Sequence, residues 1–160
     1  MSYKTTTMPG TFSQIYIHIV FAVKNRESLI HSNWEERLFQ YITAIVQNKG
    51  QKMLAINGTN NHIHFMIGMK PSCCISDIVR EVKKSSNEWI KENKLTKYKF
   101  SWQEGFGAFS YSHSQLDQVI KYVMNQKEHH KMKSFKEEYL ELLKKFEIEF
   151  DEKYLFEWIE

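Results

Sequence analysis

The chain has 160 residues, of which 42% are hydrophobic, a length and composition that support a packed core and exclude wholesale disorder. No apolar run approaches the ~20 residues of a membrane span, and no charged-then-apolar leader opens the chain, so we expect a cytoplasmic protein with no membrane partner. The net charge of +3 is unevenly spread: residues 134–160 hold 4 basic and 9 acidic side chains, whereas residues 1–133 hold 18 basic and 10 acidic ones. The basic body favours a polyanionic partner.

We predict one domain over the whole chain, with residues 1–11 as a loose tail. Residues 14–23 then alternate between apolar and mixed side chains, which predicts a strand with His18 on its polar side. The basic residues Lys24 and Arg26 lie in the loop that follows.

A helix is predicted from Ser32, where Glu35 would complete a capping box, to Gly50. A short strand over 52–56 leads into the turn 57–60, which reads Asn-Gly-Thr-Asn and indicates a hairpin.

The second arm of this hairpin, 61–67, contains two histidines around one apolar residue. As a strand it presents His62 and His64, with Met66, on one face, and the apolar Ile63, Phe65 and Ile67 on the other. Two imidazoles side by side form part of a divalent-metal site. The alternative is a pair of histidines packed on a half-buried strand.

Residues 75–93 have helical periodicity and a basic outer side, formed by Arg80, Lys83, Lys84 and Lys91. Residues 94–102 then interleave lysines with aromatic rings and end at Trp102, a pattern typical of phosphate binding and base stacking. An ordinary solvated helix face explains the lysines of the helix equally well.

A last strand, 108–112, precedes a helix over 114–128, which Ser114 and Asp117 would cap, and a helix over 134–146 opened by Ser134 and Glu137. The order of elements predicts an α+β fold: a ferredoxin-like or RRM-like antiparallel sheet with helices on one face and additional C-terminal helices.

The helix over 114–128 places Tyr122 and Gln126 four residues apart, on one face. A tyrosine on an amphipathic helix is more often a residue at the edge of the core than a nucleophile, because its hydroxyl has a reference pKa near ~10.

Residues 61–67 followed by 122–130 resemble the single-tyrosine HUH transposases of bacterial insertion sequences, including the REP-associated tyrosine transposases. In that family two histidines flank a hydrophobic residue, and the nucleophilic tyrosine lies downstream in a Tyr-x-x-x-Gln pattern. Further matching sequence segments extend the resemblance over roughly residues 12–156. One departure is Asn61, where relatives often carry an acid, so a role for charge at this position stays open.

The resemblance implies a DNA transposase in which Tyr122 attacks single-stranded DNA and forms a 5′-phosphotyrosine intermediate. It implies Mg²⁺ or Mn²⁺ held by His62, His64 and Gln126. It further implies hairpin-ended single-stranded DNA as partner and a homodimer whose two sites each combine histidines of one chain with the tyrosine helix of the other. The DNA-binding residues expected with it are Lys24, Arg26, Arg80, Lys83, Lys84, Lys91 and Trp102.

Two alternatives stay open. One is a domesticated relative that binds or nicks hairpin or repeat DNA without transposing. The other is a metal-dependent hydrolase that uses the same histidines, although it leaves Tyr122 without a role.

Overall fold

The computed structural model describes residues 10–24 and 29–155. Most of the expected N-terminal tail, and Arg26, therefore lie outside the described residues. The elements are, in chain order, β1 (Tyr16–Ala22), α1 (Glu35–Asn48), β2 (Lys52–Gly58), β3 (His62–Gly68), α2 (Ile75–Glu92), β4 (Gly107–Tyr111), η1 (His113–Gln115), α3 (Leu116–Met124), α4 (Gln126–His129), α5 (Phe135–Lys145) and η2 (Glu152–Tyr154).

The four strands form one antiparallel sheet in the order β2-β3-β1-β4. The predicted α+β fold of the ferredoxin-like kind is thus confirmed. In this order the two-histidine strand β3 lies in the middle of the sheet, where β1 and β2 satisfy its backbone on both sides. His64 pairs with Val20 of β1 and with Asn57 of β2. A central strand gives the histidine side chains a rigid base.

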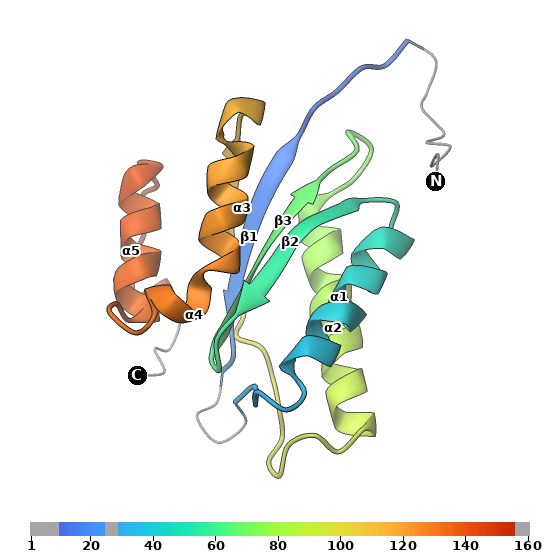
Figure 1. The fold of residues 1–160 in the computed structure, drawn as a ribbon, viewed down its shortest axis with the longest axis vertical. Helices are drawn as coiled ribbons and strands as arrows, with labels where there is room; N and C mark the ends of the chain where they lie inside the picture. The colour runs from blue at the N-terminus through green and yellow to red at the C-terminus, as the bar shows by residue number, and fades with distance from the viewer. Residues whose placement is uncertain (1–9, 25–28, 156–160) are drawn as a thin grey trace.

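Helices cover both faces of the sheet (Figure 1). On one face lie α1 and α2, packed on the apolar side of β1 and β3; this larger core includes Ile19, Phe21, Ile63, Phe65, Ile67, Leu38, Ile42, Val82 and Ile90. The predicted alternation of β3 is confirmed, because Ile63, Phe65 and Ile67 all lie in this core.

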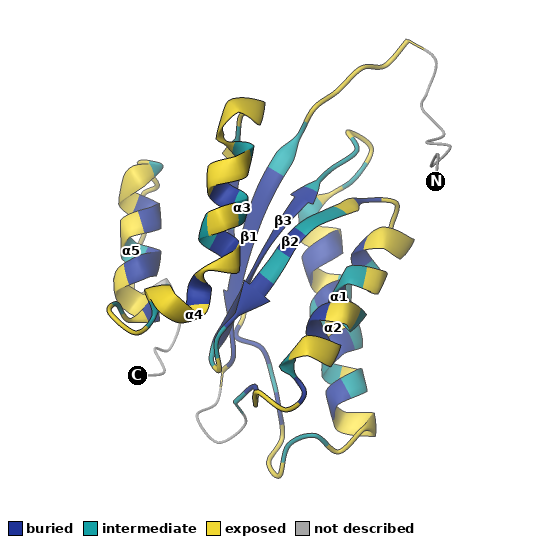
Figure 2. Ribbon diagram, viewed as in Figure 1, coloured by how far each residue is buried: buried dark blue, intermediate teal, exposed yellow. Residues whose placement is uncertain are grey.

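The other face of the sheet is covered by α3 and α5, which α4 joins (Figure 1). Met66 packs with Val119 and Val123 of α3. Phe109 of β4 packs with a cluster from α5: Phe135, Tyr139, Leu142 and Leu143. Each of these helices turns a buried stripe to the sheet and an exposed stripe to solvent (Figure 2). The histidines of β3 point into this second layer.

Two of the three predicted helix caps are wrong. Helix α1 begins at Glu35 with Trp34 in the N-cap position and no side-chain cap, so the Ser32 box does not form; the indole of Trp34, only 2% exposed, packs in the core and fixes this end. Before α3, the capping box joins Ser112 to Gln115, two residues earlier than predicted from Ser114. The cap at Ser134 is confirmed, since its hydroxyl accepts from the backbone N–H of Glu137 at 3.2 Å.

The helix predicted over 114–128 breaks at Asn125 into α3 and α4. Asn57 explains the break: its Nδ2 donates to the carbonyl oxygen of Met124 at 2.8 Å, so this carbonyl is bound outside the helix. The chain then turns, and Gln126 becomes fully buried, toward the histidines.

Among the described residues, no helix combines the length and apolarity needed to cross a bilayer. The assignment of the whole chain to one domain stays a prediction.

Gly58 ends β2 beside the two-histidine strand, and we predict that the hairpin requires it. A Cβ at this position would lie 2.4 Å from the carbonyl oxygen of His62 and 3.1 Å from Cα of Ile63. Gly58→Ala should therefore lower the free energy of unfolding by ~1–3 kcal/mol, as other overpacking substitutions do. Urea denaturation measures the loss.

Gly68→Ala is the matched control at the far end of β3, because a Cβ there meets its nearest atom at 3.7 Å. We expect a change within ~0.5 kcal/mol for this control. Equal stabilities of the two variants would contradict the steric account of the hairpin.

Candidate active site

The site begins with the two histidines of β3. The side chains of His62 and His64 are fully buried, and their ring centroids lie 5.1 Å apart. The ring of His62 also stacks on Phe135 of α5, with centroids 4.1 Å apart. The strand thus holds two imidazoles close together, facing the helices of the second layer.

Tyr122 of α3 reaches the same place. Its ring meets the edges of His64 at 5.8 Å and His18 at 6.0 Å between centroids, and its hydroxyl donates a hydrogen bond to Oε2 of Glu138. Burial, with the charge of Glu138, raises the pKa of the phenol well above its ordinary value. The hydroxyl is therefore protonated at neutral pH.

Glu138 of α5 lies at the centre of the site, and sequence reasoning missed it. The residue is 2% exposed; its Oε1 lies 2.9 Å from Nε2 of His64 and 3.2 Å from Nε2 of His130. Burial alone would raise its pKa, but the influence of His64 and hydrogen bonds from His130 and His64 hold the pKa well below its usual range. A buried carboxylate is thus kept ionised beside the tyrosine and the histidines.

His62 presents a lone pair to the centre of the site. Its Nδ1 lies 2.6 Å from Oδ1 of Asn61, which can only accept, so Nδ1 carries the hydrogen. Burial lowers the pKa of His62 well below its ordinary value, so the ring is neutral and Nε2 is the acceptor. The amide of Asn61 therefore fixes the tautomer, without the acid that relatives often carry there.

Two further acceptors face this nitrogen. Oε1 of Gln126 lies 3.3 Å and Oε1 of Glu138 lies 3.6 Å from Nε2 of His62. The orientation of the Gln126 amide is fixed because its Nε2 donates to Oε2 of Glu138 at 3.2 Å. Three electron-rich atoms close together, with no hydrogen to place between His62 and either oxygen, are the arrangement that a cation stabilises.

The donor set fits a divalent metal. His62, His64, His130 and Glu138 each offer a ligand atom, and these atoms all lie within 4.8 Å of one another. The structure also brings Gln126, predicted with His62 and His64 as a ligand, to the same point. Imidazole nitrogens with carboxylate and amide oxygens are ligands that divalent metal ions accept in proteins.

His18 of β1 supports His64 from behind. Its Nε2 lies 2.8 Å from Nδ1 of His64, and the two rings stack with centroids 5.0 Å apart. Among the described residues, Nδ1 of His18 has no hydrogen-bond partner. While Nε2 of His64 donates to Glu138, Nδ1 of His64 accepts from Nε2 of His18. Because nothing else there fixes the tautomer of His18, this hydrogen can shift to Nδ1 of His64 when Nε2 of His64 is needed as an acceptor.

The predicted DNA-binding residues lie away from this centre. Arg80, Lys84 and Lys91 are exposed on α2, across the sheet from the histidines, and Arg80 forms an ion pair with Asp77. Lys24 is exposed at the end of β1.

Lys83 and Trp102 have structural contacts instead. Nζ of Lys83 donates to the carbonyl oxygens of Gln103 at 2.7 Å and Gly105 at 2.6 Å, and burial lowers its pKa to about 8. Trp102 is 8% exposed, packs against Phe21 and donates its indole N–H to Ser86. The aromatic pattern of 94–102 predicts a stacking surface, but at Trp102 it reflects core packing.

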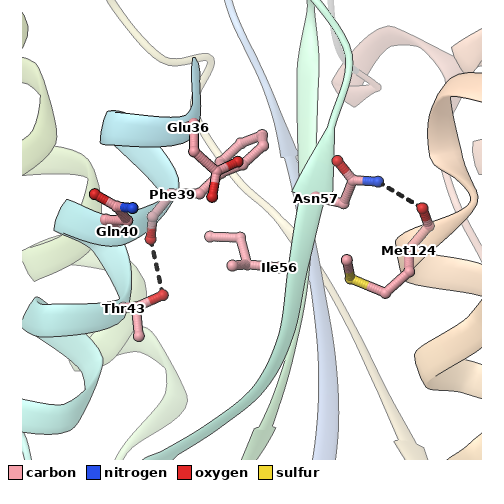
Figure 3. A pocket seen from close by; sticks show the side chains of 7 residues that line it. All are labelled: Glu36, Phe39, Gln40, Thr43, Ile56, Asn57 and Met124. Atoms are coloured by element: carbon pink, nitrogen blue, oxygen red, sulfur yellow. Dashed lines mark hydrogen bonds between the residues drawn. The ribbon is translucent and has the colours of Figure 1, made fainter. Parts of the chain in front are cut away.

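A groove of about 280 Å³ opens between α1 and the edge strand β2 (Figure 3). Glu36, Phe39, Gln40 and Thr43 line one side of it, and Ile56, Asn57 and Met124 the other. None of the imidazole or phenol groups lines this groove. Its contribution to the site is the bond from Asn57 to Met124, which ties the end of α3 to β2 next to His64.

Helical spacing could have identified the two missed residues. Glu138 lies on the buried face of α5 between Phe135 and Leu142, where an acid is expensive unless it has partners. His130 follows Gln126 by four residues, one turn further, and its Nε2 lies 3.1 Å from Oε1 of Gln126. A charged residue in an apolar stripe, close after the Tyr-x-x-x-Gln pattern, is the signal.

Comparisons with known proteins find the same fold in solved structures. A solved structure of a candidate transposase from Deinococcus radiodurans R1 shares the fold with a TM-score of 0.61 at 19% identity, covering 76% of this chain and 98% of the other. A REP-associated tyrosine transposase, solved bound to a REP hairpin, has a TM-score of 0.54 at 16% identity, covering 78% of this chain and 71% of the other. No curated protein matches the chain.

The sequence itself matches the family model for IS200-like transposases over residues 11–126. This match covers most of the chain and includes the two-histidine strand, Tyr122 and Gln126. The chain belongs to the IS200-like transposase family and is an HUH-type enzyme.

Proposed function

We propose that this transposase cleaves and rejoins single-stranded DNA with Tyr122 as nucleophile. The phenolic oxygen attacks the scissile phosphorus; the O–P bond of a 5′-phosphotyrosine forms as the bond to the 3′ oxygen breaks. The phenol passes its proton to the carboxylate of Glu138, which accepts its hydrogen bond, and the 3′ oxygen gains a proton from solvent. The phosphodiester energy is kept in the protein–DNA bond, so rejoining needs no nucleotide cofactor.

The observation that carries this proposal is the meeting of Tyr122 with the two histidines. The tyrosine hydroxyl and Nε2 of His64 bind the two oxygens of one carboxylate, Glu138. Tyr122 and His64 are 58 positions apart in sequence. If Tyr122 only packed at the edge of the core, nothing would require its hydroxyl to lie at this cluster of potential metal ligands.

We propose His62, His64 and Gln126 as ligands of Mg²⁺ or Mn²⁺, with His130 and Glu138 as further donors of the same cluster. The bound ion would act as a Lewis acid that withdraws charge from the scissile phosphate. Two imidazoles favour Mn²⁺ over Mg²⁺, which prefers an all-oxygen set.

Protein groups prepare the site around this ion. Asn61 holds the hydrogen of His62 on Nδ1, so that Nε2 is free to bind. For His64 to bind through Nε2, its hydrogen must lie on Nδ1, where Nε2 of His18 is the acceptor. Glu138 orients the hydroxyl of Tyr122 toward the cluster.

The DNA partner we propose is single-stranded DNA with hairpin ends. The REP-associated relative with the same fold was solved with a hairpin, and this chain is basic over residues 1–133. Lys24, Arg80, Lys84 and Lys91 are exposed and suit contacts to DNA outside the cleavage site. Trp102 and Lys83 are left out of this surface because both are occupied within the protein. A cytoplasmic location stays a prediction.

We further propose that each cleavage site forms within one chain. Tyr122, His62, His64 and Gln126 converge in a single chain here, so histidines from a partner are not needed. The shared-site arrangement expected from the resemblance stays the alternative. The homodimer itself stays a prediction, which analytical ultracentrifugation tests independently.

Removing one oxygen from Tyr122 tests the chemistry. Tyr122→Phe should keep the fold and the affinity for DNA but lose the covalent adduct with single-stranded DNA in Mn²⁺, seen as a shifted band on a denaturing gel. Tyr41→Phe removes the same atom from a ring on α1, which stacks on Trp89 away from the site, and should keep the adduct. An adduct formed by the Tyr122→Phe protein would exclude Tyr122 as the nucleophile.

Replacing His18 tests its role in preparing His64. His18→Phe leaves Nδ1 of His64 without an acceptor, so calorimetry should show Mn²⁺ affinity weakened by ~10–100-fold, the usual cost of removing such a partner. His18→Gln offers an amide oxygen and should stay within roughly threefold of the wild type, because an acceptor is retained. In protein with Mg²⁺ added, the ¹⁵N chemical shifts of the His64 ring nitrogens should show that Nδ1 carries the hydrogen.

Thermal melting of both His18 variants controls for folding. Wild-type Mn²⁺ affinity in a folded His18→Phe protein would show that His18 only packs.

Mixing two inactive proteins tests whether the site lies within one chain. His64→Ala and Tyr122→Phe should each be inactive, and their mixture should stay inactive, since every site would carry one lesion. Subunit exchange, if a dimer forms, is verified with differently tagged chains. Recovered cleavage in the mixture would instead establish sites shared between chains.

A further inference from the structure

A second cleft leads to Tyr122 from outside. It has a volume of about 130 Å³ and is lined by residues of α3 and α5, two helices that run side by side (Figure 1). Its lining comes from Gln115, Gln118, Val119 and Tyr122 on one side, Leu142 and Lys145 on the other, and Tyr111 of β4. The proposed nucleophile is therefore one wall of this cleft.

Lys145 is the charged group of the cleft. Its Nζ lies 5.6 Å from the ring centroids of both Tyr111 and Phe146, so two aromatic faces hold the ammonium at the last turn of α5. No carboxylate among the described residues lies within ion-pair distance of it.

The remaining lining suits a sugar–phosphate chain. Oε1 of Gln115 accepts from the backbone N–H of Ser112, which leaves the amide hydrogens of Gln115 for another acceptor. Val119 and Leu142 supply an apolar floor, and Gln118 is exposed at the rim. An ammonium, amide donors and an apolar floor fit an anionic ligand with an apolar portion.

The position of Lys145 along α5 determines which phosphate of the strand it can contact. Lys145 and Glu138 are seven residues apart on the same side of α5, which is ~10 Å along the helix. Glu138 touches the hydroxyl of Tyr122, where the scissile phosphate must arrive. Lys145 is therefore anchored further along the cleft than the tyrosine hydroxyl, which favours a phosphate that flanks the scissile one.

We propose that the α3–α5 cleft binds the single strand next to the cleavage point, with Lys145 paired to a flanking backbone phosphate. The inference rests on the proposed function, because it takes the strand to be cleaved at Tyr122. The cleft lies outside the α2 surface expected from the sequence, and its basic residue comes from the acidic C-terminal part of the chain.

The test is the salt dependence of oligo(dT) binding, measured by fluorescence anisotropy in EDTA so that no cleavage occurs. Lys145→Gln should make the slope of log affinity against log salt less negative by about 0.7, the value for one phosphate contact on a single strand. Lys144→Gln removes the same charge from the neighbouring exposed residue of α5 and should leave the slope unchanged.

A second arm separates the strand from a free phosphate ion. Inorganic phosphate should displace oligo(dT) no better than sulfate at equal ionic strength. An unchanged slope for Lys145→Gln, an equal change for Lys144→Gln, or preferential displacement by inorganic phosphate would each overturn the proposal. Formation of the Tyr122 adduct by Lys145→Gln at saturating DNA reports on the proposed function separately, whatever the slope shows.

Discussion

The candidate site depends on one unfavourable contact between three buried hydrogen-bond acceptors. Nε2 of His62, Oε1 of Gln126 and Oε1 of Glu138 face one another inside the protein, and burial removes the water that would separate them. Nε2 of His130 lies within hydrogen-bond distance of both oxygens, but no hydrogen lies between His62 and either of them, so a bound cation would relieve this contact. Each of the three comes from a different element, β3, α4 and α5, and the packing of the second layer keeps them together.

The main apolar core and the candidate active site lie on opposite faces of the same sheet. The large apolar core under α1 and α2 contains Ile63 and Phe65, the neighbours of the two histidines along β3. This core fixes the strand, so the opposite face can hold buried imidazoles and a carboxylate that add little to stability. The bond from Asn57 to the last carbonyl of α3 then sets where the tyrosine helix ends. The position of Tyr122 is thus fixed from the edge of the same sheet.

Much of the fold and of the candidate site could be predicted from the sequence, because the patterns that indicate them are local. The alternation in β3, the hairpin turn and the Tyr-x-x-x-Gln spacing follow from periods of two and 3.6 residues. The remainder depends on long-range packing. Glu138 acquires its role only when α5 crosses the sheet, and the break at Asn125 needs Asn57 from a strand 68 positions earlier. Trp102 looks like a stacking residue until its contact with Phe21 is known. The local sequence around each of these residues does not reveal these long-range contacts.

The most direct test of the account is crystallographic. Anomalous diffraction from crystals of the DNA-free protein grown with Mn²⁺ locates the ion without reference to activity. The account predicts one strong peak bounded by Nε2 of His62, Nε2 of His64 and Oε1 of Gln126, the point toward which the buried acceptors converge. A map with no peak there at saturating Mn²⁺, or with peaks only at exposed carboxylates, would contradict it, and the histidines of β3 would then be packed side chains without a metal.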